Sequence, residues 1–213
     1  MNILKLSPEK SEEILEEVLP VLRQGGVVAI PTDTIYGFAA DALNLEAVRR
    51  IFKIKGRPEE KTLPIFVSSI EEAEKLVEIN ACQRKFLEKV WPGKVTCVLK
   101  AKDVLPPEVL AKDGTVALRI PKYDFVSRLL KAFGGPLTGT SANLSGNTPL
   151  RKIKEIIAEC ATSDVAQPDI IVDAGDLPNS EPSTVVDLTI TPLKILRPGA
   201  VLEEELQKMI DML

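Results

Sequence analysis

The stretch Val27-Val-Ala-Ile-Pro-Thr-Asp-Thr-Ile-Tyr-Gly37 decides the fold class of this chain of 213 residues. Its first four residues are apolar, and a short apolar run before a polar loop is typical of a buried strand. Four hydrogen-bonding side chains then follow, at Thr32, Asp33, Thr34 and Tyr36. Open α/β sheets bind ligands beyond the carboxyl ends of their strands, so this loop is a candidate binding site. The alternative is that Asp33 and the threonines only form hydrogen-bonded turns.

Helix and strand signals alternate on both sides of this stretch. Ser7-Pro8 predicts a helix start with proline in the first turn, and Gly25-Gly26 predicts the end of that helix. Further helices are expected after Asn44 and Ser69, over about 124–133, from Thr148-Pro149 to Glu159, and at the C-terminus. Further strands are expected at 63–67, 95–100, 116–120, 170–172, 184–188 and 193–196. No internal repeat or Pro/Ser-rich linker divides the chain, so we expect a single α/β domain over residues 1–213. Because the last three strands have no helix between them, we expect its sheet to be mixed.

The composition excludes several kinds of site. The chain has no histidine, which excludes a Ser-His or Cys-His nucleophile and a histidine-ligated zinc site. Its three cysteines are too few for a four-thiolate zinc site, and their odd number and wide spacing favour a reducing compartment. No apolar run is long enough to span a bilayer and no signal peptide is evident, so we expect a cytoplasmic protein. If the protein is an enzyme, its chemistry must use lysine, arginine, carboxylates, hydroxyls, backbone N–H groups or a metal ion bound by oxygen atoms. These groups suit the handling of phosphates better than general acid–base hydrolysis.

A cluster of cations surrounds a glycine and a proline between Lys53 and Lys61. Arginine binds phosphate or carboxylate oxygens as a planar fork, whereas lysine supplies a mobile point charge. The Lys-x-Arg spacing of Lys55 and Arg57 therefore suits a polyphosphate held from two sides. A solvated charged surface, with Glu59 and Glu60 as internal counter-ions, is the alternative.

The segment Thr138-Gly-Thr-Ser-Ala-Asn-Leu-Ser-Gly-Asn-Thr148 carries small hydroxyl or amide side chains at most positions. Two glycines permit close backbone approach, and the hydroxyl and N–H groups can surround anionic oxygens. The phosphate-loop pattern G-x-x-x-x-G-K-[ST] is absent, and a polar surface turn is the alternative.

Two arginines lie in predicted strands, Arg119 inside one and Arg197 at the end of another. A partly buried arginine needs an anionic partner, which is either an acidic residue of the protein or a ligand. Strand alternation puts Arg119 on the face opposite to Leu118 and Ile120, so we expect one face in the core and the other in a cavity.

Seven motifs together resemble those of the YrdC/YciO family, whose best-known members are threonylcarbamoyl-AMP synthases acting in tRNA modification. The matching segments are 31–37, 55–58 with Lys61 and Pro64, 91–93, 119–121, 140–146, 182–187 and 197–199. The resemblance spans about residues 8–200 and is closest to the short, single-domain form. It implies a twisted mixed sheet flanked by helices around a large concave, positively lined cavity. It also implies the reaction, in which L-threonine, bicarbonate and ATP give threonylcarbamoyl-AMP and pyrophosphate.

The resemblance further implies which residues form the site. The catalytic residues would be Lys55, Arg57, Ser141 and Asn143. ATP would contact Arg57, Lys61, Thr115, Ser141, Asn143, Pro149 and Arg197. L-Threonine would contact Thr34, Arg119, Gly139 and Ser183. Mg²⁺ would be held through the ATP phosphates, with no protein ligand of its own. One position departs from the family pattern, because Phe66 stands where many synthases carry a histidine.

Two alternatives remain open from the sequence. A double-stranded RNA or tRNA-binding module would use the cations Arg49, Arg50, Lys53, Lys55, Arg57, Lys61, Lys85, Lys89, Lys94 and Lys100. A net charge of −4 and 4% aromatic residues count against it, because RNA-binding domains are usually basic. A YciO-type paralogue with the same nucleotide site and another acceptor is the second alternative. In the synthase interpretation, a tRNA-modifying threonylcarbamoyl transferase system would use the product.

Overall fold

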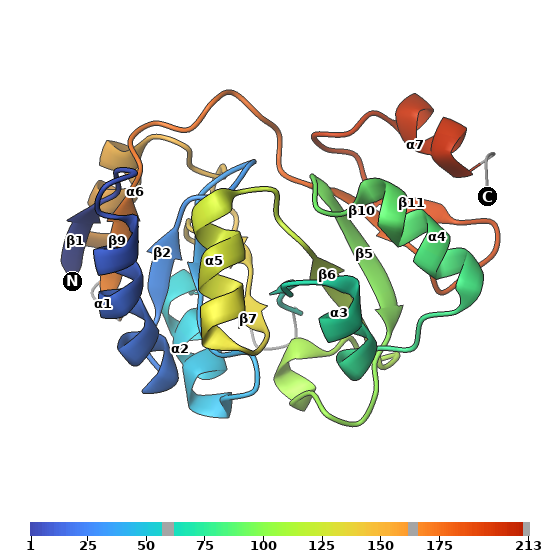
Figure 1. Cartoon of the computed structure of the whole chain (residues 1–213), viewed down its shortest axis with the longest axis horizontal. Coiled ribbons are helices and arrows are strands. Elements are labelled where there is room, and N and C mark those ends of the chain that lie inside the picture. The colour runs from blue at the N-terminus through green and yellow to red at the C-terminus, as the bar shows by residue number, and fades with distance from the viewer. Residues whose placement is uncertain (57–61, 162–165, 211–213) are drawn as a thin grey trace.

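The computed structural model describes residues 1–56, 62–161 and 166–210 (Figure 1). Arg57 and Lys61, two of the residues expected to bind ATP, lie outside this described part. The described helices are α1 (Ser11–Arg23), α2 (Leu45–Lys55), α3 (Ile70–Leu76), α4 (Ala81–Val90), α5 (Asp124–Phe133), α6 (Ile153–Ala161) and α7 (Glu203–Ile210). A short 3₁₀ helix spans Pro107–Val109. No described helix has the length and apolar character needed to cross a membrane.

The strands form two mixed sheets. The five-stranded sheet has the order β1 (Asn2–Lys5), β9 (Ile170–Asp173), β2 (Val28–Ile30), β3 (Gly37–Ala39) and β8 (Thr140–Ser141). The six-stranded sheet has the order β11 (Lys194–Arg197), β10 (Thr184–Asp187), β5 (Val95–Lys100), β6 (Thr115–Arg119), β4 (Ile65–Phe66) and β7 (Leu137–Thr138). Each sheet contains both parallel and antiparallel pairs. The mixed α/β fold is therefore confirmed, with its strands divided between two sheets.

Alternation along β2 connects the sequence to the packing of the first sheet. Val28 and Ile30 pack into a core with the apolar faces of α1 and α5, whereas Val27 and Ala29 pack into the core that contains α2. Helices α1 and α5 lie side by side over the same face of this sheet in Figure 1. All four side chains are fully buried because this central strand has helices on both faces.

Several predicted boundaries are confirmed. Helix α2 begins after Asn44, whose side chain accepts a hydrogen bond from the backbone N–H of Ala47, and α3 begins after Ser69 in the same way. Strand β5 and helix α5 have the predicted ends.

Two predicted helix starts are wrong. Helix α1 begins at Ser11 rather than at Pro8, because the backbone N–H of Lys10 closes a turn on the carbonyl of Ser7. Helix α6 begins at Ile153 rather than at Pro149, and the Ile153 N–H is satisfied by the side chain of Asp176 from a distant loop.

Candidate functional site

A cavity of about 320 Å³ lies between the loop that follows β2 and one face of the six-stranded sheet. The loop contributes Thr32, Thr34, Ile35 and Tyr36 to its wall, and the start of β3 contributes Gly37. The segment around β8 contributes Gly139, Thr140, Ser141 and, further on, Pro149. Polar loops from one sheet thus meet a strand face of the other, which is a common way to build a ligand site.

Strand register explains which side chains of the six-stranded sheet line the cavity. The lining residues are cross-strand partners of one another: Val185 with Thr96, Val98 with Ala117, and Arg119 with Phe66. Val116, Leu118 and Ile120, which alternate with the β6 lining residues, belong to the hydrophobic core. The predicted division of this strand into a core face and a cavity face is confirmed.

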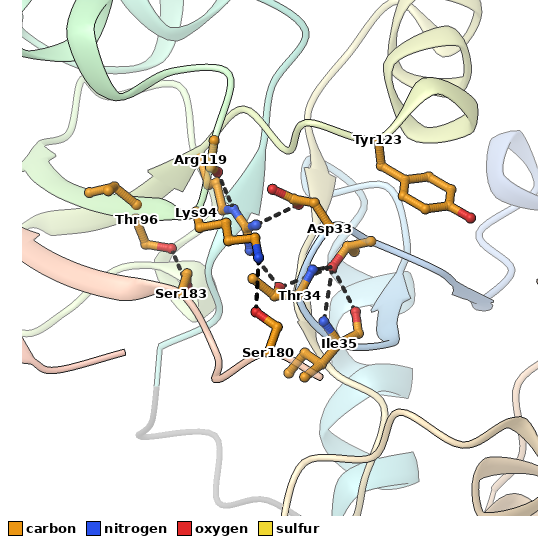
Figure 2. Close-up of polar contacts among 12 residues, drawn as sticks. Asp33, Thr34, Ile35, Lys94, Thr96, Arg119, Tyr123, Ser180 and Ser183 are labelled. Carbon is orange, nitrogen blue, oxygen red and sulfur yellow. Dashed lines mark hydrogen bonds and ion pairs between the residues drawn. The ribbon is translucent and has the colours of Figure 1, made fainter. Parts of the chain in front are cut away.

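Arg119 is buried at 3% exposure and its guanidinium is held by three parts of the protein (Figure 2). Its Nε donates to the backbone carbonyl of Gly93 at 2.8 Å, and one terminal nitrogen donates to Thr34 Oγ1 at 3.0 Å. The other terminal nitrogen lies 2.6 Å from a carboxylate oxygen of Asp33. Burial lowers the pKa of Arg119, whereas the Asp33 charge and hydrogen bond raise it. Both alternatives from the sequence therefore hold: the arginine has an internal partner and it lines the cavity.

The loop after β2 is shaped by its own hydroxyl groups. Thr32 Oγ1 accepts hydrogen bonds from the backbone N–H groups of Thr34 and Ile35 and donates to the carbonyl of Ile35. Tyr36 donates from its hydroxyl to the carbonyl of Gly175 at 2.7 Å and accepts from the N–H of Ala174. The threonines do form turns, and these turns present Thr34 to the cavity.

A second arginine reaches the cavity from β11. Arg197 donates to the backbone carbonyl of Ser183 at 2.7 Å, and the Ser183 hydroxyl shares a buried 2.8 Å hydrogen bond with Thr96 Oγ1. Burial lowers the pKa of Arg197, and its charge in turn lowers the pKa of Arg119. Two guanidinium groups in one cavity favour an anionic ligand.

The cavity brings together most of the described residues that were predicted to bind substrates. Those that line it are Thr34, Arg119, Gly139, Ser141, Pro149, Ser183 and Arg197. Gly139 is required by close packing, since a Cβ there would lie 2.4 Å from the ring of Phe66. Phe66 itself lines the cavity beside Arg119, whose guanidinium carbon lies 6.0 Å from the centre of the ring.

Three predicted site residues do not line this cavity. Lys55 is buried beneath the segment that contains β8, where its ammonium donates to the backbone carbonyls of Ser141 and Asn143. The Asn143 amide donates to the carbonyls of Leu144 and Asn147, so it closes the same loop. Thr115 lies on β6 two residues before the lining residue Ala117, and its hydroxyl donates to the carboxylate of Asp113.

The cations considered for RNA binding include two arginines with acidic partners. Arg49 pairs with Glu46 and Glu108, and Arg50 pairs with Asp169. These pairs reduce the positive charge that this part of α2 offers to a phosphate backbone.

Thr96 and Val185 are cavity residues that the sequence analysis did not select. Both lie in correctly predicted strands, and alternation with the buried Cys97 and Val186 was the signal that could have found them. Within the described ranges, no group of three or more acidic or cysteine side chains could hold a metal ion. A carboxylate beside the cavity, that of Asp33, is already paired with Arg119.

The model of the Sua5/YciO/YrdC family, described as "Telomere recombination", matches residues 20–199, so the chain belongs to this family. It is 37% identical over 190 residues to a threonylcarbamoyl-AMP synthase of Pyrococcus abyssi, covering 89% of this chain and 55% of that protein. It is 34% identical over 207 residues to the mouse (Mus musculus) threonylcarbamoyl-AMP synthase, covering 92% of this chain and 71% of the relative.

Solved structures agree with this assignment. P. abyssi Sua5 complexed with L-threonine superposes with a TM-score of 0.89 at 33% identity, covering 98% of this chain and 60% of that one. Escherichia coli YciO shares the fold, with a TM-score of 0.82 at 24% identity over 93% of this chain and 94% of its own. The chain thus spans little more than half the length of the P. abyssi relatives that it matches.

Proposed function

We propose that this protein is an L-threonylcarbamoyl-AMP synthase that uses L-threonine, bicarbonate and ATP. The observation that carries the proposal is the buried guanidinium of Arg119, which lines a cavity together with Thr34, Ser183 and a second arginine, Arg197. An amino acid carboxylate suits the arginine fork, and nearby hydroxyls suit the remaining polar groups of threonine. The names of the relatives, and the L-threonine bound to P. abyssi Sua5, support the same substrate.

The reaction requires little acid–base help from the protein. The amine nitrogen of threonine forms a bond to the carbon of bicarbonate, and water leaves. A carbamate oxygen then attacks the α-phosphorus of ATP, the bond to the bridging oxygen breaks, and pyrophosphate leaves with both electrons. The second step needs charge neutralisation and correct placement, which a histidine-free cavity with two arginines can supply.

The assignment of individual residues rests on the family resemblance, and the place of seven of them in the cavity wall supports it. Arg119, Thr34, Gly139 and Ser183 would surround the threonine, and Ser141, Pro149 and Arg197 would contact ATP. Lys55 and Asn143 would act on the loop that carries Ser141. We retain Arg57 and Lys61 as ATP ligands, and Thr115 as a contact at the margin of the site.

Mg²⁺ would be held through the ATP phosphates, where it would neutralise charge on the leaving pyrophosphate. The cavity suits this arrangement, because its described lining residues include several hydroxyl side chains and no carboxylate, and the nearby Asp33 carboxylate is paired with Arg119. The product would then pass to a tRNA-modifying transferase system, which attaches the threonylcarbamoyl group to an adenosine beside the anticodon.

Phe66 favours one alternative, a YciO-type paralogue in which the nucleotide chemistry is the same and the acceptor is not threonine. Its ring brings an apolar surface to the amino acid side of the cavity, next to Arg119. Pyrophosphate release from ATP in the presence of bicarbonate, measured with L-threonine, with other amino acids and with none, tests both versions. Stimulation by threonine above all others supports the synthase, and stimulation by another amino acid alone replaces threonine as the acceptor.

A further inference from the structure

Asp33 lies directly behind the amino acid site without lining it. Its side chain is 10% exposed, and one carboxylate oxygen contacts Arg119 at 2.6 Å. The other oxygen, Oδ2, is buried and has no hydrogen-bond partner among the described residues. Figure 2 shows the carboxylate directed from the loop after β2 toward the guanidinium of Arg119, which comes from a strand of the other sheet. A buried carboxylate that uses only one of its oxygens requires an explanation, since orphaned acceptors are costly.

The hydrogen-bond inventory of Arg119 supplies part of that explanation. A guanidinium has five N–H donors, and the protein occupies three of them through Gly93, Thr34 and Asp33. Each terminal nitrogen therefore keeps one N–H that no described protein atom takes. Two donors on adjacent nitrogens are the arrangement that a planar carboxylate accepts. By accepting one hydrogen of a terminal nitrogen of Arg119, Asp33 fixes which hydrogen of that nitrogen stays available for a ligand.

The charges around Arg119 supply the other part of the explanation for the buried carboxylate. Arg119 is almost fully buried and a second guanidinium, Arg197, lies close enough to repel it. An uncompensated cation in this position would be costly, so a carboxylate suits the site better than a neutral amide even though one oxygen is left unpaired.

We propose that Asp33 is a positioning residue for the amino acid site, which orients the guanidinium of Arg119 toward the substrate carboxylate and balances its charge when the site is empty. The proposal rests on the proposed function for the identity of the substrate. It assigns to Asp33 two separable contributions, because orientation requires an acceptor atom whereas charge balance requires the negative charge.

Three substitutions separate these contributions. Asp33→Asn keeps an acceptor oxygen and removes the charge, so it should lower the melting temperature and leave the Kd for L-threonine within about threefold of wild type. Asp33→Ala removes both, and should raise that Kd roughly tenfold or more, because small misplacements of a binding group are expensive. Asp33→Glu keeps the charge but displaces the oxygens, and should weaken threonine binding in a stable protein. Asp41→Ala, at a carboxylate outside the cavity, is the matched control.

The test combines calorimetric titration with L-threonine and with ATP, thermal unfolding, and ¹⁵N NMR of the Arg119 side chain. The expected result is that Ala and Glu weaken threonine binding, Asn does not, and ATP binding is unchanged throughout. Threonine affinity equal to wild type in both the Ala and Glu variants would overturn the proposal, as would affinity that simply follows melting temperature. If Asp33→Ala does not fold, the comparison of Glu with Asn decides.

The NMR measurement separates this proposal from the proposed function. If the wild-type protein does not bind L-threonine, the proposed substrate is wrong. The Arg119 side-chain resonances then still test whether Asp33 orients the guanidinium. The positioning role is supported if the motion of the terminal nitrogens of Arg119 is restricted in the wild type and in Asp33→Asn. The same nitrogens should be mobile in Asp33→Glu and Asp33→Ala. Equal restriction in all of these proteins overturns it.

Discussion

The ammonium nitrogen of Lys55 donates a 2.7 Å hydrogen bond to the backbone carbonyl of Asn143, from the last turn of α2 to the loop that follows β8. It also donates to the carbonyl of Ser141, and the side chain is only 2% exposed. Two carbonyl oxygens are thereby turned toward Lys55, and the loop between them carries Ser141 to the cavity wall. Lys55 thus supports, from behind, the segment that places Ser141 in the cavity wall.

Lys55→Met should disrupt both the loop and the fold. Methionine fills similar space but cannot donate, so two buried carbonyls lose their charged partner. We expect the free energy of unfolding to fall by about 1.5–3 kcal/mol, the range for hydrogen bonds to charged groups. Urea unfolding measures this, together with loss of ATP-dependent turnover.

Lys53→Met is the matched control, because Lys53 is exposed on the same helix. Its stability and turnover should stay close to wild type. A Lys55→Met protein as stable as this control, but inactive, would show instead that Lys55 contacts the substrate directly.

Gly139→Ala should displace the ring of Phe66. The new methyl group would lie 2.4 Å from that ring, a distance at which one of the two must move. Overpacking of this kind costs about 1–3 kcal/mol, and the shifted ring should also weaken amino acid binding beside Arg119. Gly135→Ala, where the nearest atom lies at 3.3 Å, should be mild. Calorimetry that finds both variants equal in threonine affinity would exclude the packing explanation.

Arg119→Lys should not rescue the function of the arginine. A lysine ammonium cannot reproduce the donors that reach Gly93, Thr34 and Asp33 while also binding a planar carboxylate. Amino acid affinity should fall by about 2–5 kcal/mol, the range for truncating a buried charge pair. Titration with L-threonine and with threonine amide checks the assignment in the wild type, since the amide should bind much more weakly. Equal binding of acid and amide would mean that Arg119 does not recognise a carboxylate.

Asp169 should make the stability of the fold sensitive to acid. Burial raises the pKa of Asp169, but hydrogen bonds from Arg50 and from the backbone N–H of Val27 outweigh it and lower the pKa below its ordinary value. A lowered pKa in the folded state adds stability above the unfolded pKa of about 3.9, and that stability is lost as the pH falls through the folded value.

The difference in free energy of unfolding between wild type and Asp169→Asn should therefore be largest near neutral pH and should decrease as the pH falls. Urea unfolding across this range measures it, with the exposed Asp103→Asn as control. A difference in the free energy of unfolding that does not change with pH would show that the ionisation of Asp169 does not cause the acid sensitivity.

Local patterns predicted much of the fold because their causes are local. Alternation along β6 placed Arg119 on the other face of the strand from Leu118, and the side chain of Asn44 marked the start of α2. Helix α4 was not predicted, although Asn80 and Gln83 form the capping box that signals its start.

The remaining features depend on contacts between distant residues. The division of the strands into two sheets follows from long-range pairing, such as β10 with β5, which no local pattern encodes. The partner of Arg119 is Asp33, 86 residues away, and the start of α6 depends on Asp176. Sequence motifs selected seven of the residues that line the cavity, whereas the contacts made by Lys55 and Asp33 required the structure.

The most direct test of the central claim is mass spectrometry of the nucleotide product. The purified protein is incubated with ATP, Mg²⁺, L-threonine and isotopically labelled bicarbonate. We expect threonylcarbamoyl-AMP that carries the label and forms only when all components are present, with much less from Arg119→Lys. Release of AMP or pyrophosphate without a labelled threonylcarbamoyl product would contradict the account.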